Sequence, residues 1–124
     1  LINEFKKYTN DLFISTDDGS LGYKGLITDL LQDRITDEKF DIIYTCGPEI
    51  MMKKVAQTAN QAGIPCQVSL EQRMGCGIGA CLACACKIKI KPGKENDKES
   101  YNQGWHYKRV CKDGPVFWGD EVEW

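Results

Sequence analysis

The residues best suited to chemistry are cysteines, of which this 124-residue chain has seven. Cys76, Cys81 and Cys84 follow the pattern C-x4-C-x2-C, and Cys111 lies well downstream. Three thiolates on one loop with a distant fourth is the ligand spacing of plant-type [2Fe-2S] ferredoxins. We therefore predict that these four cysteines hold a [2Fe-2S] cluster.

The residues between the predicted ligands fit the same chemistry. Gly75, Gly77 and Gly79 let the chain turn tightly and bring backbone N–H groups close to sulfur. Ala80 and Ala83 are small and leave room for the inorganic core. The loop is therefore expected to surround four negative charges with backbone donors.

The cysteines could also form a zinc site, a Rieske centre or a cluster with a different fourth ligand. Structural zinc sites also use four thiolates but usually show two C-x2-C pairs, and this chain has one. A Rieske centre needs two histidine ligands, and His106 is the only histidine. Cys86 is the alternative fourth ligand, but its alternation with Ile88 and Ile90 places it on the core face of a strand. Cys66 is expected to serve packing.

The elements that must position the cysteines fall into two halves, which meet near Ser69 to Arg73. In the first half, short apolar runs alternate with helical patterns, which favours parallel strands joined by right-handed crossovers. The second half has no comparable helix. The first half is predicted to have strands at 12–16, 41–45 and 64–70 and helices at 25–35 and 48–62; the second, strands at 86–91, 107–111 and 116–124 and a turn over 92–100.

The predicted fold class is α/β plus a small mostly-β domain. Residues 1–70 are expected to form a partial parallel nucleotide-binding sheet. Residues 71–124 are expected to form a ferredoxin-like [2Fe-2S] domain.

Two predicted strand ends carry residues suited to a nucleotide. Ligands of open parallel sheets bind beyond the carboxyl ends of the strands. Asp17 and Asp18, followed by Gly19, could accept hydrogen bonds from ribose hydroxyls and repel a 2′-phosphate, which favours NAD over NADP; the alternative is a plain Asp-Gly turn. The run Cys46-Gly47-Pro48 begins a helix, whose N-terminus suits a diphosphate or a nicotinamide amide.

Composition excludes several classes of protein. The chain is 42% hydrophobic and 27% charged, which argues against intrinsic disorder, and its net charge of −2 gives no electrostatic basis for binding nucleic acid. No uncharged run is long enough to span a bilayer, and no signal peptide is evident. We expect a cytoplasmic protein and, since the chain does not begin with Met, a part of a longer one.

Four separate motifs resemble one family. Residues 69–84 (SLEQRMGCGIGACLAC) and 107–117 (YKRVCKDGPVF) are similar to the electron-transfer subunit of two-subunit, NAD-dependent dihydroorotate dehydrogenase. Residues 16–25 (TDDGSLGYKG) and 46–51 (CGPEIM) resemble its nicotinamide-nucleotide domain. The resemblance runs in the same order from residue 11 onward.

The resemblance implies an electron relay in pyrimidine biosynthesis. In that family, an FAD-binding β-barrel, an NAD-binding domain and a [2Fe-2S] domain pass electrons between NAD(H) and FMN in a catalytic partner subunit, as a heterotetramer of two plus two. It also implies that Cys46-Gly47-Pro48 faces the nicotinamide ring.

This chain departs from the family pattern in two respects. It has no counterpart of the flavin barrel or of the opening strand of the nucleotide domain, so FAD is expected only in the full-length subunit. The stretch from Cys84 to Cys111 is long and suggests an insertion. No acid, base or nucleophile is assigned. The alternatives are a subunit of a related NAD(P)H:ferredoxin-type flavin reductase and a zinc-stabilised interaction module.

Overall fold

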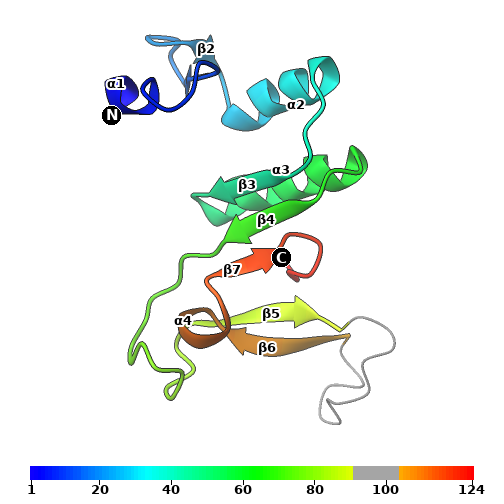
Figure 1. Cartoon of the computed structure of the whole chain (residues 1–124). Coiled ribbons are helices and arrows are strands. Elements are labelled where there is room, and N and C mark those ends of the chain that lie inside the picture. Colours follow the sequence, from blue (N-terminus) through cyan, green and yellow to red (C-terminus); the bar gives the residue numbers. More distant parts are fainter. Residues whose placement is uncertain (91–103) are drawn as a thin grey trace. The chain divides into compact units, whose positions relative to one another are not determined.

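A computed structural model describes residues 1–90 and 104–124 and divides the chain into two compact units, residues 1–39 and 40–124. The predicted turn at 92–100 lies outside the described residues. The helices and strands are coloured along the chain in Figure 1.

The first unit contains two short helices and one two-stranded sheet. Its elements are α1 (Ile2–Phe5), β1 (Ser15–Thr16), β2 (Tyr23–Lys24) and α2 (Ile27–Asp37). In α2, Thr28 and Leu30 are buried, and the Arg34 guanidinium lies 4.7 Å from the centre of the Phe13 ring. The helix predicted at 25–35 is therefore confirmed, about two residues further along.

The predicted strand at 12–16 is largely wrong. Only Ser15–Thr16 is a strand, and within the described part of the chain it pairs in parallel with β2 and not with the strands near 43 or 66. Residues 17–22 loop round so that β2 runs beside β1 in the same direction, and β1 therefore finds its partner locally.

The second unit contains the parallel pair that the first half predicts. β3 (Ile43–Cys46) and β4 (Cys66–Ser69) pair in parallel, with Ile43 opposite Cys66, and α3 (Glu49–Gln61) is the crossover between them. The helix packs Met52, Val55 and Ala59 into the core. Gly63, with φ of +70°, follows the helix end, as expected for a glycine that terminates a helix.

The third strand of this sheet comes from the C-terminal part of the chain. β7 (Val116–Trp118) runs antiparallel to β4, with Val68 opposite Phe117, and Gly119 N–H donates to the Cys66 carbonyl at 2.8 Å. The sheet is therefore mixed, in the order β3-β4-β7 (Figure 1). Segments on both sides of residue 70 thus share one core.

The cysteine-rich half forms an antiparallel hairpin and a helical turn. β5 (Ala85–Lys89) pairs with β6 (Trp105–Arg109), and α4 (Val110–Asp113) follows directly. Ile88 is buried, as the alternation predicts, and bridges to Val122. The lysines at 87 and 89 are exposed.

The predicted strand at 107–111 ends early, at Arg109. The backbone N–H of Arg109 donates to the Asp113 carboxylate at 2.8 Å, which satisfies a donor at the start of α4. Cys111 therefore lies in a helical turn and not in a strand.

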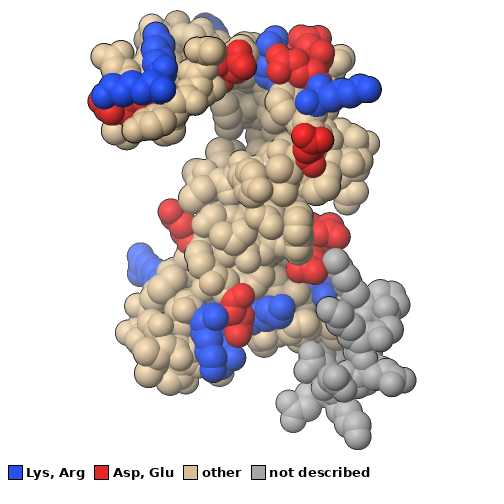
Figure 2. Space-filling view, in the orientation of Figure 1, with Lys and Arg blue, Asp and Glu red and all other residues tan. Residues whose placement is uncertain are grey.

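Charges of both signs occur on the face that Figure 2 shows, with basic and acidic side chains interspersed. Among the described residues, no helix is both long and apolar enough to cross a bilayer.

Candidate metal centre

The loop that carries Cys76 and Cys81 has no regular secondary structure and turns repeatedly. Gly77 and Gly79 have φ of +69° and +83°, and Leu82 has φ of +59°. Leu82 is the only non-glycine residue with positive φ in the described chain, a conformation that carries backbone strain. These turns direct successive N–H groups toward the cysteine sulfurs.

Cys76 lies in a cradle of backbone donors. The N–H groups of Cys81, Ile78 and Ala80 point at its sulfur and lower the pKa of the Cys76 thiol to about 6. The Ala80 nitrogen is 3.2 Å from Cys76 Sγ. Such a nest of N–H groups favours an anion, here a thiolate.

Cys84 and Cys111 form a second contact. The Cys111 N–H donates to Cys84 Sγ at 3.4 Å, and this bond, helped by the Cys111 thiol, lowers the pKa of Cys84. Conversely, the hydrogen bond with Cys84 raises the pKa of Cys111. A hydrogen bond to sulfur thus connects two residues that are 27 positions apart in the sequence.

The four thiols meet as two pairs, because the Cys76 thiol also contacts the Cys81 thiol. A [2Fe-2S] cluster has two irons and four thiolate ligands, two for each iron, so two pairs suit it. A single zinc ion needs all its ligands about 2.0–2.3 Å from one point. In the parts of the chain that the structure describes, no three ligating side chains converge in that way. The donor set therefore fits a [2Fe-2S] cluster.

Cys86 and Cys66 have different surroundings. Cys86 is half-buried on β5, and burial raises the pKa of its thiol. Cys66 is buried in β4, and burial raises its pKa as well. Burial opposes the thiolate form that a ligand needs, whereas the pKa of Cys111 is raised first by its hydrogen bond with Cys84, another predicted ligand. The expectation that Cys66 serves packing agrees with its burial.

Cys46-Gly47-Pro48 lies where the sequence predicts, between the end of β3 and the start of α3. Cys46 is exposed, and its Sγ is 4.0 Å from Glu71 Oε1. This turn borders a cavity of about 390 Å³ whose wall also includes Glu71, Cys86 and Trp124. The sequence pattern assigns no role to Glu71, although this residue lies in the motif before Cys76.

The Asp17-Asp18-Gly19 segment belongs to the first unit and forms the turn after β1. Asp18 Oδ1 accepts a hydrogen bond from the Ser20 N–H at 2.9 Å, and this bond lowers the pKa of Asp18. Gly19 has φ of +75°. The plain-turn interpretation accounts for this geometry, and a nucleotide role for the segment stays a prediction.

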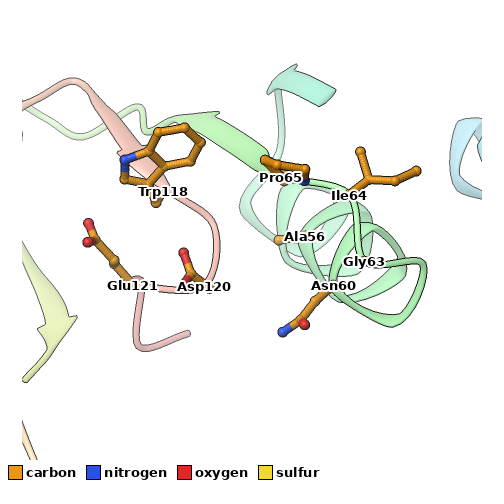
Figure 3. A pocket seen from close by; sticks show the side chains of 9 residues that line it. Ala56, Asn60, Gly63, Ile64, Pro65, Trp118, Asp120 and Glu121 are labelled. Atoms are coloured by element: carbon orange, nitrogen blue, oxygen red, sulfur yellow. The ribbon is translucent and has the colours of Figure 1, made fainter. Parts of the chain in front are cut away.

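Another cavity, of about 400 Å³, lies beside α3 (Figure 3). Ala56 and Asn60 of the helix line one side, and Trp118 and Asp120 line another. None of the four predicted cluster ligands borders it. This cavity is therefore separate from the candidate metal centre.

Comparisons with known proteins agree with the cysteine geometry. Residues 71–123 match a family model described as the iron–sulfur cluster binding domain of dihydroorotate dehydrogenase B. A probable electron transfer subunit of dihydroorotate dehydrogenase B (NAD(+)) from Methanocaldococcus jannaschii is 47% identical over 98% of this chain and 40% of its own length. The corresponding subunit from Caldanaerobacter subterraneus is 46% identical over 90% of this chain and 40% of its own length.

A solved structure of an NADH-dependent reduced ferredoxin-NADP oxidoreductase, studied for flavin-based electron bifurcation, is also similar. It is 36% identical, with a TM-score of 0.77 over 100% of this chain and 39% of that chain. The chain spans about two-fifths of the length of the first two curated relatives. Over nearly its whole length the chain is similar to dihydroorotate dehydrogenase B electron transfer subunits, and its residues 71–123 match the model of their iron–sulfur cluster binding domain.

Proposed function

We propose that this chain transfers single electrons through a [2Fe-2S] cluster held by Cys76, Cys81, Cys84 and Cys111. The observation that carries the proposal is the arrangement of these thiols as two contacting pairs with backbone N–H groups aimed at their sulfurs. When bound, the cluster supplies one-electron chemistry with no transfer of atoms.

The protein's part is to stabilise thiolates and to position them. The donors around Cys76 compensate its negative charge, as its lowered pKa indicates. The Cys111 N–H does the same for Cys84 and ties α4 to the end of the loop. Because α4 follows β6 directly, the hairpin sets the distance between the two ligand segments.

The proposed physiological setting is an NAD-dependent dihydroorotate dehydrogenase of pyrimidine biosynthesis in the cytoplasm. In this proposal, residues 1–70 are the partial NAD-binding domain, with contacts from Asp17-Asp18-Gly19 and Cys46-Gly47-Pro48, and residues 71–124 are a ferredoxin-like [2Fe-2S] domain. FAD binds elsewhere in the full-length subunit, and a heterotetramer with two FMN-containing catalytic subunits is expected. The names of the relatives support this setting.

Exposed apolar side chains on the cysteine loop support a protein partner. Met74, Ile78 and Leu82 are 51%, 75% and 61% exposed. Clustered apolar exposure is a feature of interaction sites. We propose that the FMN-containing partner covers this loop, which would shorten the electron path.

The second candidate is a subunit of a related ferredoxin-linked NAD(P)H reductase. The similarity to the solved ferredoxin-NADP oxidoreductase favours it. The two candidates share the metal centre and differ in the electron acceptor. Zinc-stabilised interaction is disfavoured by the paired geometry of the thiols.

The metal centre is tested by reconstituting the protein anaerobically with iron and sulfide. We expect two irons and two acid-labile sulfides for each chain, one-electron reduction by dithionite, and the paramagnetic signal of a reduced [2Fe-2S] centre. Stoichiometric zinc in the purified protein, with no acid-labile sulfide, would falsify the proposal.

The physiological setting is tested by NADH oxidation. The chain alone is expected not to oxidise NADH at a useful rate, because NADH gives up a two-electron hydride and a flavin must divide the pair. Adding the complete flavin-bearing subunit and its FMN partner should restore dihydroorotate-linked turnover. Turnover with ferredoxin and NADP instead would favour the second candidate, and brisk NADH oxidation by the flavin-free chain would contradict this division of labour.

A further inference from the structure

One peptide unit joins the two segments that carry the predicted ligands. The carbonyl of Gly79 accepts a hydrogen bond from Arg109 Nη1 at 3.1 Å. The N–H of Ala80, in the same peptide unit, donates to Cys76 Sγ at 3.2 Å. In a planar trans peptide, the C=O and N–H groups point in opposite directions. Holding the carbonyl therefore aims the N–H at the sulfur.

The preceding peptide reaches the other thiol pair. The Gly79 N–H lies against the Cys111 sulfur and lowers its pKa, opposing the larger effect of Cys84. Gly79 thus lies between a sulfur from each pair. A rotation of its backbone would misdirect donors to both Cys76 and Cys111.

The Arg109 side chain is fixed for this contact. Its Nε donates to Asp113 Oδ2 at 3.1 Å, while Nη1 remains directed at Gly79. A guanidinium can make both contacts at once because its donors form a rigid fork, whereas a lysine ammonium is a single point. The side chains of Arg109 and Asp113 are 32% and 27% exposed, so the ion pair itself adds little to stability.

We propose that Arg109 is a positioning residue that sets the reduction potential of the metal centre by holding the Gly79–Ala80 peptide with its N–H on Cys76. This inference rests on the proposed function. Hydrogen bonds to ligand sulfurs and nearby positive charge both stabilise the more negative, reduced state. Loss of Arg109 therefore lowers the potential.

The test compares Arg109→Gln, Arg109→Lys and Lys108→Gln in the full chain after reconstitution. Lys108 is the adjacent residue of β6, lies opposite Cys86 in the strand register, and carries the same charge, so it controls for charge alone. Potentials are measured by redox titration. The N–H···S bond is measured as the coupling of an exchangeable deuteron to the reduced centre by electron–nuclear double resonance.

For Arg109→Gln, we expect the ratio of reduced to oxidised protein at a fixed potential to fall about tenfold, which is about 59 mV for one electron. Arg109→Lys keeps the charge but loses the fork, so it should show a smaller fall and a weakened deuteron coupling. Lys108→Gln should change the ratio less than about twofold, because Lys108 lies opposite Cys86, which is not a predicted ligand.

Several outcomes overturn the inference. They are an unchanged potential in Arg109→Gln, a wild-type potential and coupling in Arg109→Lys, and an effect of Lys108→Gln as large as that of Arg109→Gln. If Arg109→Gln does not retain the cluster, the deuteron coupling measured in Arg109→Lys decides whether Arg109 positions the Gly79–Ala80 peptide. A wild-type protein that assembles no iron and sulfide instead refutes the proposed function, so the two failures are distinguishable.

Discussion

At the scale of single residues, the cysteines of the second half differ in their contacts. Cys111 touches Cys84 and receives the Gly79 N–H, whereas Cys86 is half-buried on β5, two residues before Ile88. We predict that Cys111→Ser lowers cluster content by more than about tenfold, because it removes one of the four thiolates. Iron, acid-labile sulfide and visible absorbance measure this loss.

Cys86→Ala is the matched control. It should keep the cluster and cost no more than about 1 kcal/mol of unfolding free energy, as expected for a small half-buried side chain. Chemical denaturation measures that cost. Normal absorbance in Cys111→Ser with none in Cys86→Ala would reverse the ligand assignment.

Cys66 and Cys46 give a prediction about thiol reactivity and pH. Burial raises the pKa of Cys66 above the ordinary value of 9.0, whereas Cys46 is exposed. At pH 7.5, iodoacetamide should modify Cys46 at least about tenfold faster than Cys66, because the thiolate is the reactive form. Peptide mass spectrometry at timed intervals measures both rates.

The same raised pKa gives Cys66 a pH-dependent effect on stability. Its neutral form is favoured in the folded state, so the contribution is fully present below pH 9 and is lost as the pH rises through the folded-state pKa. Equal modification rates for Cys46 and Cys66 in the folded protein would contradict the burial of Cys66.

At the scale of elements, the cysteine loop depends on two glycines that are not equivalent. Both Gly77 and Gly79 have positive φ, which costs an alanine about 1–2 kcal/mol. A Cβ on Gly77 meets nothing within 4 Å, but a Cβ on Gly79 would lie 2.8 Å from Lys112 Cδ. We expect Gly77→Ala to keep its cluster and Gly79→Ala to lose more stability and bind less iron.

The cause can be checked with a second variant. Lys112→Ala removes the closest atom that the new Cβ would meet, so the double variant should recover part of the loss. Iron content and denaturation midpoints measure this recovery. If Gly77→Ala and Gly79→Ala behave alike, the contact between the loop and α4 is not what makes Gly79 necessary.

At the scale of the whole molecule, the C-terminal strand ties the cysteine-rich half to the parallel sheet. Phe117 of β7 is 5% exposed and lies opposite Val68, which is fully buried. Phe117→Ala should cost about 3–5 kcal/mol of unfolding free energy. Because β7 follows the Cys111 segment, we expect one unfolding transition for residues 40–124. The cluster absorbance and the far-ultraviolet circular dichroism should be lost together in that transition.

Val116→Ala is the control on the same strand. Val116 is 49% exposed, so its truncation should cost less than about 1 kcal/mol. Denaturation followed by both signals distinguishes the alternatives. Two well-separated transitions would show that β7 does not couple the sheet to the cysteine loop.

The sequence alone determined the features that depend on local spacing. The alternation at Cys86 to Ile90 predicts that Ile88 is buried, as the structure confirms, whereas the ligand set indicated by the C-x4-C-x2-C pattern and Cys111 stays a prediction. The helix at 48–62 and its end at Gly63 were also predictable, because proline and glycine mark helix ends through their own backbone preferences.

The tertiary structure decided what depends on distant partners. The local pattern at 107–111 suggested a strand, but the Arg109–Asp113 contact starts a helical turn that places Cys111 against Cys84. The strand predicted at 12–16 is limited to β1, which pairs with the nearby β2. β7 lies beyond the predicted domain boundary at residue 70 and yet pairs with β4. The pairing of four thiols and the peptide held by Arg109 depend on hydrogen bonds between segments up to 30 residues apart. No one-dimensional spacing specifies such bonds, because their geometry is set by the packing of the elements that carry them.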